Sequence, residues 1–457
     1  MCIRVEVRTI TETIPDCVVT FIEALRKDLC EPAFVQRHRM RAEDFTRERQ
    51  LTFPVVMLFI LQKTAKSIQR HLHEFLNRLG GGELYDSVSA GAWTHARAKL
   101  RHTAFVELNA ELVVPTAYHP ERKEVRRWRG HRVLGIDGST LRLPNHPELF
   151  EQFTSIPMNS EPDGPVKKYP QARFSVIYDL LNRIGLDGQL RPSSEGEVGL
   201  AVEQLDRAAV NDVIVTDRGY TGYPYLSAVS YMGLDFVSRC STGSFAAAQQ
   251  LFRRNRAGRS VLTKIRAAPD HKGQLNDCGR QLELLVRFIS LRLPTGELEV
   301  LVTSLLDEQK YPTEDFSEVY GFRWNQETFY FLLKSRLDLE NFSGQTAEAV
   351  RQDFYSTLLL ANLETILIEP AQNALTQESA AHKNIKTVNH AVSYHAIKHR
   401  LIELLYSQVP AAEVITDLQK MFRAVPVCRR KERKMQRQKP SLHRSYYFQK
   451  CVKKVTF

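Results

Sequence analysis

The 457-residue sequence predicts an α/β fold flanked by helical regions on both sides. In the middle of the chain, short apolar runs that end in turn residues alternate with helical periodicity, which indicates a mixed sheet. Before and after this region the apolar residues keep helical spacing, from about Thr11 to Val114 and again beyond Leu337. The length exceeds one ordinary core, and 43% of the residues are apolar, so the chain can build two or three domains.

The first predicted region, residues 1–127, is helical and is a candidate DNA-binding region. Apolar residues recur three and four positions apart from Cys17 to Leu29 and from Val55 to Leu79. Basic residues gather between Arg37 and Arg49 and in a predicted helix from Ser89 to Leu100. A helix-turn-helix that reads DNA and a plain helical bundle both fit this pattern, and no recognisable turn decides between them.

Two aspartates follow apolar strands in the next predicted region, residues 128–240. The first strand, Arg132–Ile136, is expected to stop at Asp137-Gly138, and the buried strand Asp212–Thr216 to end at Asp217. An open α/β sheet places ligand groups at such strand ends, although either aspartate alone is ordinary turn chemistry. The other elements predicted here are a hairpin of Ala172–Asp179 with Ile184–Arg191, helices Leu200–Ala209 and Tyr225–Met232, and strand Asp235–Arg239.

The rest of the chain is predicted to hold an insertion, the end of the core and a helical region. Residues 241–310 are β-rich and lie between the two parts of the core, the second of which is residues 311–365. Helical spacing continues through residues 366–426, before a basic tail at residues 427–457. The strands expected in the insertion are Ser260–Ala267, Gln281–Leu291 and Glu297–Leu305.

A third acid lies on a predicted helix, Tyr320–Lys334, whose polar residues share one side. At about 100° per residue, the stripe consists of Tyr320, Arg323, Glu327 and Lys334. On a single helix such a stripe is usually a solvated face with weak ion pairs. Together with Asp137 and Asp217, however, Glu327 completes three hard oxygen donors, which suit Mg²⁺ or Mn²⁺. Two such ions can activate an attacking oxygen and stabilise a leaving one in phosphodiester chemistry.

Other catalytic classes lack their motifs. The sequence has no Gly-rich loop ending in Gly-Lys-Ser/Thr, and Ser139 lacks a nucleophile elbow, which disfavours nucleotide hydrolysis and triad hydrolysis. No HExxH occurs, and the seven cysteines make no CxxC pair. Metal-dependent phosphodiester chemistry is therefore the leading expectation.

Three sequence blocks resemble a known family in their order and spacing. The spacing Tyr320-x2-Arg323-x3-Glu327-x6-Lys334 is similar to the signature around the third carboxylate of the insertion-sequence-four family of bacterial DDE transposases. The blocks GIDGSTLRLP, starting at Gly135, and VIVTDRGY, starting at Val213, resemble its two aspartate blocks. The resemblance covers roughly residues 128–340 and, less distinctly, the N-terminal region.

The resemblance implies a ribonuclease H-like core with a β-rich insertion, and DNA cleavage with strand transfer at the ends of an insertion element. By position, it implies that two Mg²⁺ or Mn²⁺ ions bind the catalytic acids Asp137, Asp217 and Glu327. It also implies that the DNA backbone is contacted by Tyr320, Arg323 and Lys334. The implied partners are double-stranded DNA, as terminal inverted repeats and as target, and a second copy of the chain in the DNA complex. No membrane or nucleotide partner is expected. A catalytically silent DNA-binding repressor and a ribonuclease H-like nuclease without strand transfer are the alternatives.

The net charge of +11 is concentrated in the tail, residues 427–457. Eleven Lys and Arg residues stand there against one acid, and the rest of the chain has 52 basic and 51 acidic residues. A DNA-binding arm, a solubilising end and attraction to an acidic membrane surface all fit this charge. The most apolar run, Leu51–Leu61, is too short to span a bilayer. We expect a cytoplasmic bacterial protein associated with the nucleoid.

Overall fold

The computed structural model describes residues 15–47, 49–63, 67–80, 88–122, 125–158, 167–293 and 295–429. The chain forms two compact units, which are described separately. The helical unit comprises Met1–Lys123 and Leu359–Phe457, and the sheet unit comprises Glu124–Leu358. The basic tail predicted from the sequence lies, from residue 430 onward, outside the described residues.

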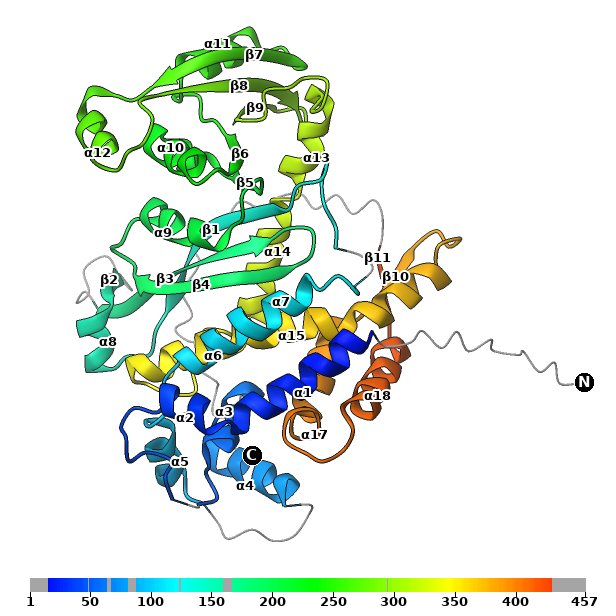
Figure 1. Cartoon of the computed structure of the whole chain (residues 1–457). Coiled ribbons are helices and arrows are strands. Elements are labelled where there is room, and N and C mark those ends of the chain that lie inside the picture. Colours follow the sequence, from blue (N-terminus) through cyan, green and yellow to red (C-terminus); the bar gives the residue numbers. More distant parts are fainter. Residues whose placement is uncertain are drawn as a thin grey trace, which may run out of the picture. The chain divides into compact units, whose positions relative to one another are not determined.

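The helical unit packs around α3 (Phe53–Gln62), whose ten residues are all buried. A helix that is apolar on every side needs neighbours all round, and α1, α16 and α17 contact it. A two-stranded ribbon, β10 (Ile385–Thr387) with β11 (Val427–Arg429), completes the unit. Its other helices are α1 (Asp16–Cys30), α2 (Pro32–His38), α4 (Ile68–Leu79), α5 (Ala90–Arg97), α6 (Thr103–Leu108), α7 (Val114–Ala117), α16 (His390–His399), α17 (Leu401–Leu405), α18 (Ala411–Ala424) and the second part of α15 (Ala347–Glu378) (Figure 1).

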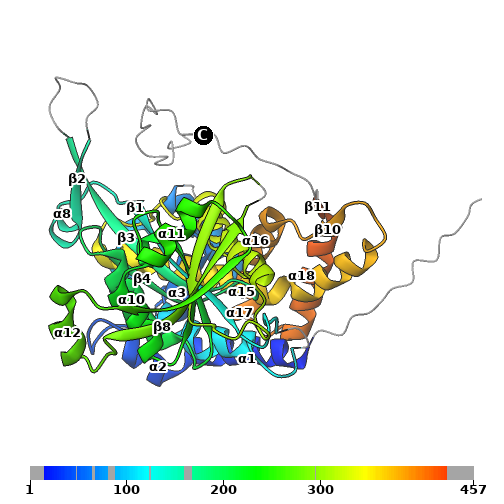
Figure 2. The same ribbon diagram turned by 90° about the horizontal axis from the view of Figure 1, so that it is seen from above.

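A nine-stranded mixed sheet is the core of the sheet unit (Figure 1 and Figure 2). The strand order is β2-β3-β1-β5-β6-β9-β8-β7, and β4 pairs with β3. Strand β1 runs antiparallel to β3 and parallel to β5, and β5 runs parallel to β6. The strands are β1 (Val133–Arg142), β2 (Thr154–Met158), β3 (Lys167–Asp179), β4 (Ile184–Pro192), β5 (Val213–Thr216), β6 (Asp235–Arg239), β7 (Arg259–Arg266), β8 (Glu283–Arg292) and β9 (Leu298–Thr303). The predicted α/β class with helical flanks is confirmed.

Helices cover the sheet and place polar groups beside it. Figure 1 shows α9 and α14 on different sides of β1 and β3. The helices of this unit are α8 (Pro147–Gln152), α9 (Glu197–Gln204), α10 (Tyr223–Tyr231), α11 (Ala246–Arg254), α12 (Lys272–Asp277), α13 (Phe316–Gly321), α14 (Trp324–Phe331) and the first part of α15.

The predicted end of the first strand at Asp137-Gly138 is wrong. Strand β1 continues to Arg142, because every residue from Asp137 to Arg142 pairs with β3 in antiparallel register. Its first four residues, Val133 to Ile136, are buried, whereas Asp137 to Thr140 are half-buried. Asp137 therefore lies on a regular strand, where a fully buried segment gives way to a half-buried one.

The three strands predicted between residues 241 and 310 extend the same sheet. Strands β7, β8 and β9 pair antiparallel with one another, and β9 pairs with β6 through Val237 and Thr303. Helices α11 and α12 lie between the strands in the sequence. This segment therefore continues the core sheet past β6.

The single helix predicted for Tyr320–Lys334 is also wrong in detail. Helix α13 ends at Gly321, α14 runs from Trp324 to Phe331, and a π-helical turn follows at Leu332–Arg336. At the junction, backbone hydrogen bonds join residues three positions apart, as in the tighter 3₁₀-helix. Examples are Arg323 N to Tyr320 O (3.1 Å) and Gln326 N to Arg323 O (3.0 Å). Phe322 and Arg323 keep helical dihedral angles, so the chain passes from α13 into α14 without leaving the helical conformation.

Within the described parts of the chain, no helix is both long and apolar enough to cross a membrane.

Candidate active site

The parallel pairing of β1 with β5 places the two predicted aspartates beside each other. Gly135 pairs with Val215, and Asp137 and Asp217 each lie two residues farther along. The pairing ends at Gly135 and Val215, so both acids follow the paired segment at the same end of the two strands. Strand β5 ends at Thr216 while β1 continues to Arg142, so the edge of β1 opens next to Asp137.

Helix α14 is held against β1 and β3 by side-chain hydrogen bonds to the backbone. Gln326 Nε2 donates to Val176 O (3.0 Å), and Asn325 Nδ2 donates to Leu180 O (2.8 Å). The Tyr330 hydroxyl donates to Asp137 O and accepts from Val176 N. These contacts fix the helix that carries Glu327 beside the strand that carries Asp137.

Gly135 makes this close approach possible. A Cβ atom on Gly135 would lie 2.8 Å from Gln326 Oε1 and 2.8 Å from Leu180 Cδ2. Gln326 is fully buried, so its amide has little room to move away. A glycine in a strand often marks such an approach of another element.

Arg323 and Tyr320 link Glu327 to Asp217. Arg323 Nη2 lies 2.9 Å from Glu327 Oε1, and its guanidinium carbon lies 5.7 Å from the centre of the Tyr320 ring. The Tyr320 hydroxyl donates to Asp217 Oδ1 at 3.4 Å. Two of the three side chains expected to contact DNA therefore already contact predicted catalytic acids.

Lys334 reaches β1 from the π-helical turn. Its ammonium group donates to Ser139 Oγ and to Thr140 O, both at 2.8 Å. Burial lowers the pKa of Lys334, and the charge of Glu340 opposes this effect. An ammonium group has three donors, and the Lys334 nitrogen also lies 5.4 Å from the centre of the Phe174 ring.

Two residues that the sequence did not single out extend the contacts of Asp217: Arg239 lies next to it, and Glu299 lies next to Arg239. Arg239, at the end of β6, places Nη1 3.8 Å from Asp217 Oδ1 and Nη2 3.1 Å from Glu299 Oε1. Glu299 lies on β9 with only 3% of its surface exposed, and burial raises its pKa. The signals were present: Arg239 ends the strand parallel to β5, and Glu299 is the one acid within the apolar run Leu298–Thr303.

Helix α14 also exposes two aromatic rings that the sequence analysis left out of the site. Trp324 is 56% exposed and Phe331 is 62% exposed, on the helix that carries Glu327. The Arg323 guanidinium carbon lies 5.6 Å from the centre of the Trp324 ring. Exposed rings of this kind can stack on unpaired bases.

Comparison with known proteins decides the family. The family described as "Transposase DDE domain" matches residues 128–363, just over half of the chain. The chain belongs to the DDE transposase family. Over 346 residues it is 22% identical to transposase InsG of insertion sequence element IS4 from Escherichia coli (strain K12), and the match covers 74% of each chain. A piggyBac transposase in a synaptic complex with hairpin DNA matches 88% of this chain and 85% of that chain, at 11% identity. The TM-score is 0.43.

The resemblance to insertion-sequence-four transposases is thereby confirmed. The protein is a DNA transposase, an enzyme of a family that cleaves DNA, transfers strands and uses divalent metal ions. The silent repressor and the simple nuclease are not favoured. Residues 128–363, which the family model matches, include five neighbouring strands of the sheet, in the order β4-β3-β1-β5-β6.

Burial makes the carboxyl group of Asp137 a weaker acid than usual. It raises the pKa of the carboxyl group to about 6, and the charges of Glu197 and Asp217 add to the effect. The hydrogen bond from Gly138 N to Asp137 Oδ1 (2.9 Å) and the charge of Arg323 oppose it. The ionised form of Asp137 therefore destabilises the folded transposase, and a bound cation would offset this destabilisation.

We expect Asp137→Asn to stabilise the transposase at neutral pH when a chelator removes divalent ions. The pKa of the Asp137 carboxyl group is raised from 3.8 to about 6 on folding, so its contribution to the free energy of unfolding is fully present below pH ~4. This contribution is lost as the pH rises through 6, and the loss is about 2–3 kcal/mol at most. The amide that replaces the carboxylate stays neutral and can still accept from Gly138 N. In thermal unfolding from pH 4 to 8, the melting temperature of the variant should rise relative to that of the wild type as the pH rises. Parallel curves would contradict the burial of this charge.

The three predicted catalytic acids are spread over a wider space than the ligands of one ion. In the described residues, only Cys17, His119 and Glu121 form a group of three candidate ligands whose atoms all lie within 4.8 Å of one another. That group belongs to the helical unit. Glu327 and Asp217 are instead linked through Arg323 and Tyr320, and the charge of Arg323 also acts on Asp137.

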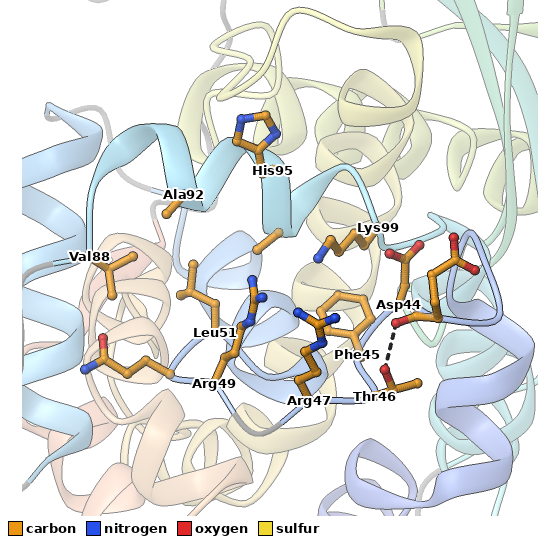
Figure 3. A pocket seen from close by; sticks show the side chains of 13 residues that line it. Asp44, Phe45, Thr46, Arg47, Arg49, Leu51, Val88, Ala92, His95 and Lys99 are labelled. Atoms are coloured by element: carbon orange, nitrogen blue, oxygen red, sulfur yellow. Dashed lines mark hydrogen bonds between the residues drawn. The ribbon is translucent and has the colours of Figure 1, made fainter.

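A basic concavity in the helical unit gathers residues from both predicted basic stretches (Figure 3). Its volume is about 760 Å³. One wall is the loop before α3, with Arg47 and Arg49, and the other is α5 and the residues after it, with His95 and Lys99. Figure 3 shows the side chains of Arg47, Arg49 and Lys99 extending from both walls. Glu43 and Asp44 lie at the same concavity, and the Asp44 carboxylate accepts from Arg41 N (3.0 Å).

Proposed function

We propose that this transposase binds the terminal inverted repeats of its insertion element, cuts the DNA there and joins the ends to target DNA. In this proposal Asp137, Asp217 and Glu327 hold two divalent ions, Mg²⁺ or Mn²⁺. The observation that carries it is the meeting of strand β1, the end of β5 and helix α14 at one opened sheet edge, each with one carboxylate.

The residues at this edge fit hard divalent ions. They are carboxylates, the donors that Mg²⁺ and Mn²⁺ prefer, and the raised pKa of Asp137 reflects a carboxylate that gains from a nearby cation. The spread of the acids suits two ions better than one. Bound divalent ions would polarise the phosphate and make water or a DNA hydroxyl a stronger nucleophile.

The cations around the acids would position the DNA backbone. Arg323 is held by Glu327, and a guanidinium so oriented can pair with a phosphate. Lys334 would offer its positive charge to a phosphate from the β1 side. Arg239, fixed by buried Glu299, adds a third positive charge next to Asp217. Tyr320 would hold the side chains of Asp217 and Arg323 in position through its hydroxyl group and its ring.

Cleavage and joining by the purified protein test the proposal. The full-length transposase would be incubated with linear DNA carrying the terminal repeats of its own element, a target plasmid and Mg²⁺. We expect cuts at the repeat ends, joined products in the plasmid, and loss of both with EDTA. If the protein cuts the repeats but forms no joined products, it is a nuclease without strand transfer. If it binds the repeats but does not cut them, it is a DNA-binding repressor. Because two ends must be brought together, we also infer two copies of the chain in the DNA complex.

We further infer that the basic concavity of the helical unit contacts DNA phosphates. Arg47 and Lys99 face it from opposite walls, and replacing both with Ala should remove about two phosphate contacts. The slope of log affinity against log salt should then fall by about 2. Fluorescence anisotropy with terminal-repeat DNA at several salt concentrations measures this slope.

A matched control removes two cations elsewhere in the same unit. Arg70 and Lys420 are exposed and paired with Glu74 and Asp417, and replacing them with Ala should leave the slope near the wild-type value. Equal slopes for both double variants would show that the concavity does not touch DNA.

A further inference from the structure

A fourth carboxylate, Glu197, approaches Asp137 from the side of the sheet opposite α14. Glu197 is the first residue of α9. A Cβ on Gly138 would lie 2.8 Å from Glu197 Cγ and 2.9 Å from its Cδ, so Glu197 occupies the space that a side chain at Gly138 would need. Side chains alternate along a strand, and a Gly135 side chain would meet α14. Gly135 and Gly138 therefore admit α14 and α9 from opposite faces.

Acids on both faces of the sheet lie near the opened edge of β1. Pairing of β1 with β5 ends before Asp137, so no parallel strand separates the two faces at this point. The charge of Glu197 accordingly acts on Asp137 and on Tyr330, which lies on α14. Arg173, on β3, orients Glu197 with Nε at 3.5 Å from Oε1.

A buried hydroxyl without a partner lies near the same acids. Tyr220 follows Asp217 by three residues and is only 2% exposed, and its hydroxyl has no hydrogen-bond partner among the described residues. Burial raises its pKa, and the charges of Asp137 and Glu197 raise it further. Leaving such a group unpaired is unfavourable, so a polar ligand near this hydroxyl would be stabilising.

We propose that Glu197 is a fourth carboxylate ligand of the divalent-ion site, and that it approaches Asp137 from the α9 face. The inference rests on the proposed function, since it adds a ligand to the same site. It also explains why a glycine follows Asp137 on a regular strand: any side chain there would push the Glu197 carboxylate away.

Mn²⁺ binding to the full-length protein without DNA tests this inference. Mn²⁺ prefers oxygen ligands, whereas zinc would also be drawn to the Cys17, His119 and Glu121 group. Electron paramagnetic resonance of free Mn²⁺ gives the affinity. We expect Glu197→Gln to weaken binding about tenfold or more, in the range seen when groups around a metal site are removed.

Gly138→Ala tests whether Glu197 acts as a metal ligand or only through its charge, because this variant moves the Glu197 side chain without removing its charge. It keeps every ionisable group, and because Glu197 is a half-exposed, flexible side chain, the new methyl can displace it without unfolding the sheet. We expect a similar loss of Mn²⁺ affinity, and this variant decides the matter if Glu197→Gln fails to fold. The control is Glu203→Gln, on the same helix, whose exposed side chain pairs with Arg191, and which should bind Mn²⁺ like the wild type.

Asp137→Asn distinguishes the two possible failures. If it weakens Mn²⁺ binding while Glu197→Gln and Gly138→Ala behave like Glu203→Gln, the role of Glu197 is overturned and the proposed site stands. If Asp137→Asn also binds Mn²⁺ normally, the proposed function itself is wrong.

Discussion

Asp137→Asn, Asp217→Asn and Glu327→Gln are each expected to reduce cleavage of terminal-repeat DNA by about 10³-fold or more. Each substitution keeps the shape of the side chain and removes one charge that would hold a divalent ion. Losing that ion removes several kcal/mol of transition-state stabilisation, and about 4 kcal/mol corresponds to a factor of 10³. Single-turnover cleavage in Mg²⁺, with the rate read from a labelled strand, measures the loss.

DNA binding and a matched acid provide the controls. All three variants should bind terminal-repeat DNA within a few-fold of the wild type, because the cations around the site remain. Glu283→Gln, on β8, removes an acid from the same unit that pairs with Lys264 and Arg266, and should cleave normally. Any of the three variants that still nicks DNA at a normal rate does not carry an essential ligand.

Gly135→Ala is expected to destabilise the sheet unit and to impair cleavage together. The added methyl would press on Gln326 Oε1 and Leu180 Cδ2, both at 2.8 Å, and Gln326 has no exposed surface into which to move. Overpacking of this kind costs about 1–3 kcal/mol. For a unit of this size the melting temperature should fall by roughly 3–10 °C. Because α14 would have to shift, Glu327 would leave its place beside β1, and cleavage should fall even at temperatures where the protein is folded.

Gly199→Ala is the matched control. Gly199 lies on α9 with open space where its Cβ would be. Alanine favours a helix over glycine, so this variant should be as stable as the wild type or slightly more so. If Gly135→Ala and Gly199→Ala melt and cleave alike, the close packing of α14 on β1 is not what positions Glu327.

Much of the fold was predictable because local patterns decided it. The hairpin of β3 and β4, the buried strand β5 and the strand β6 were foreseen within a few residues, since apolar runs and turn residues mark them. The end of β1 was not foreseen, because Asp137-Gly138 has the composition of a turn. Its pairing partner, β3, lies more than 30 residues away and keeps it extended.

The candidate site was only partly predictable, for a similar reason. The family spacing pointed to Asp137, Asp217 and Glu327, but a spacing cannot reveal which side chains meet from other elements. Arg239 and Glu197 reach the same edge from β6 and α9, and only the folded sheet brings them there. The break between α13 and α14 was likewise invisible, because helical periodicity continues through the tightened turn.

Anomalous X-ray diffraction from crystals of the transposase with Mn²⁺ and terminal-repeat DNA tests the central claim most directly. The predicted result is a pair of Mn²⁺ peaks about 3.5–4 Å apart at the opened edge of β1, within ligand distance of Asp137, Asp217 and Glu327. Peaks elsewhere, or acids held too far apart to share the ions, would contradict it.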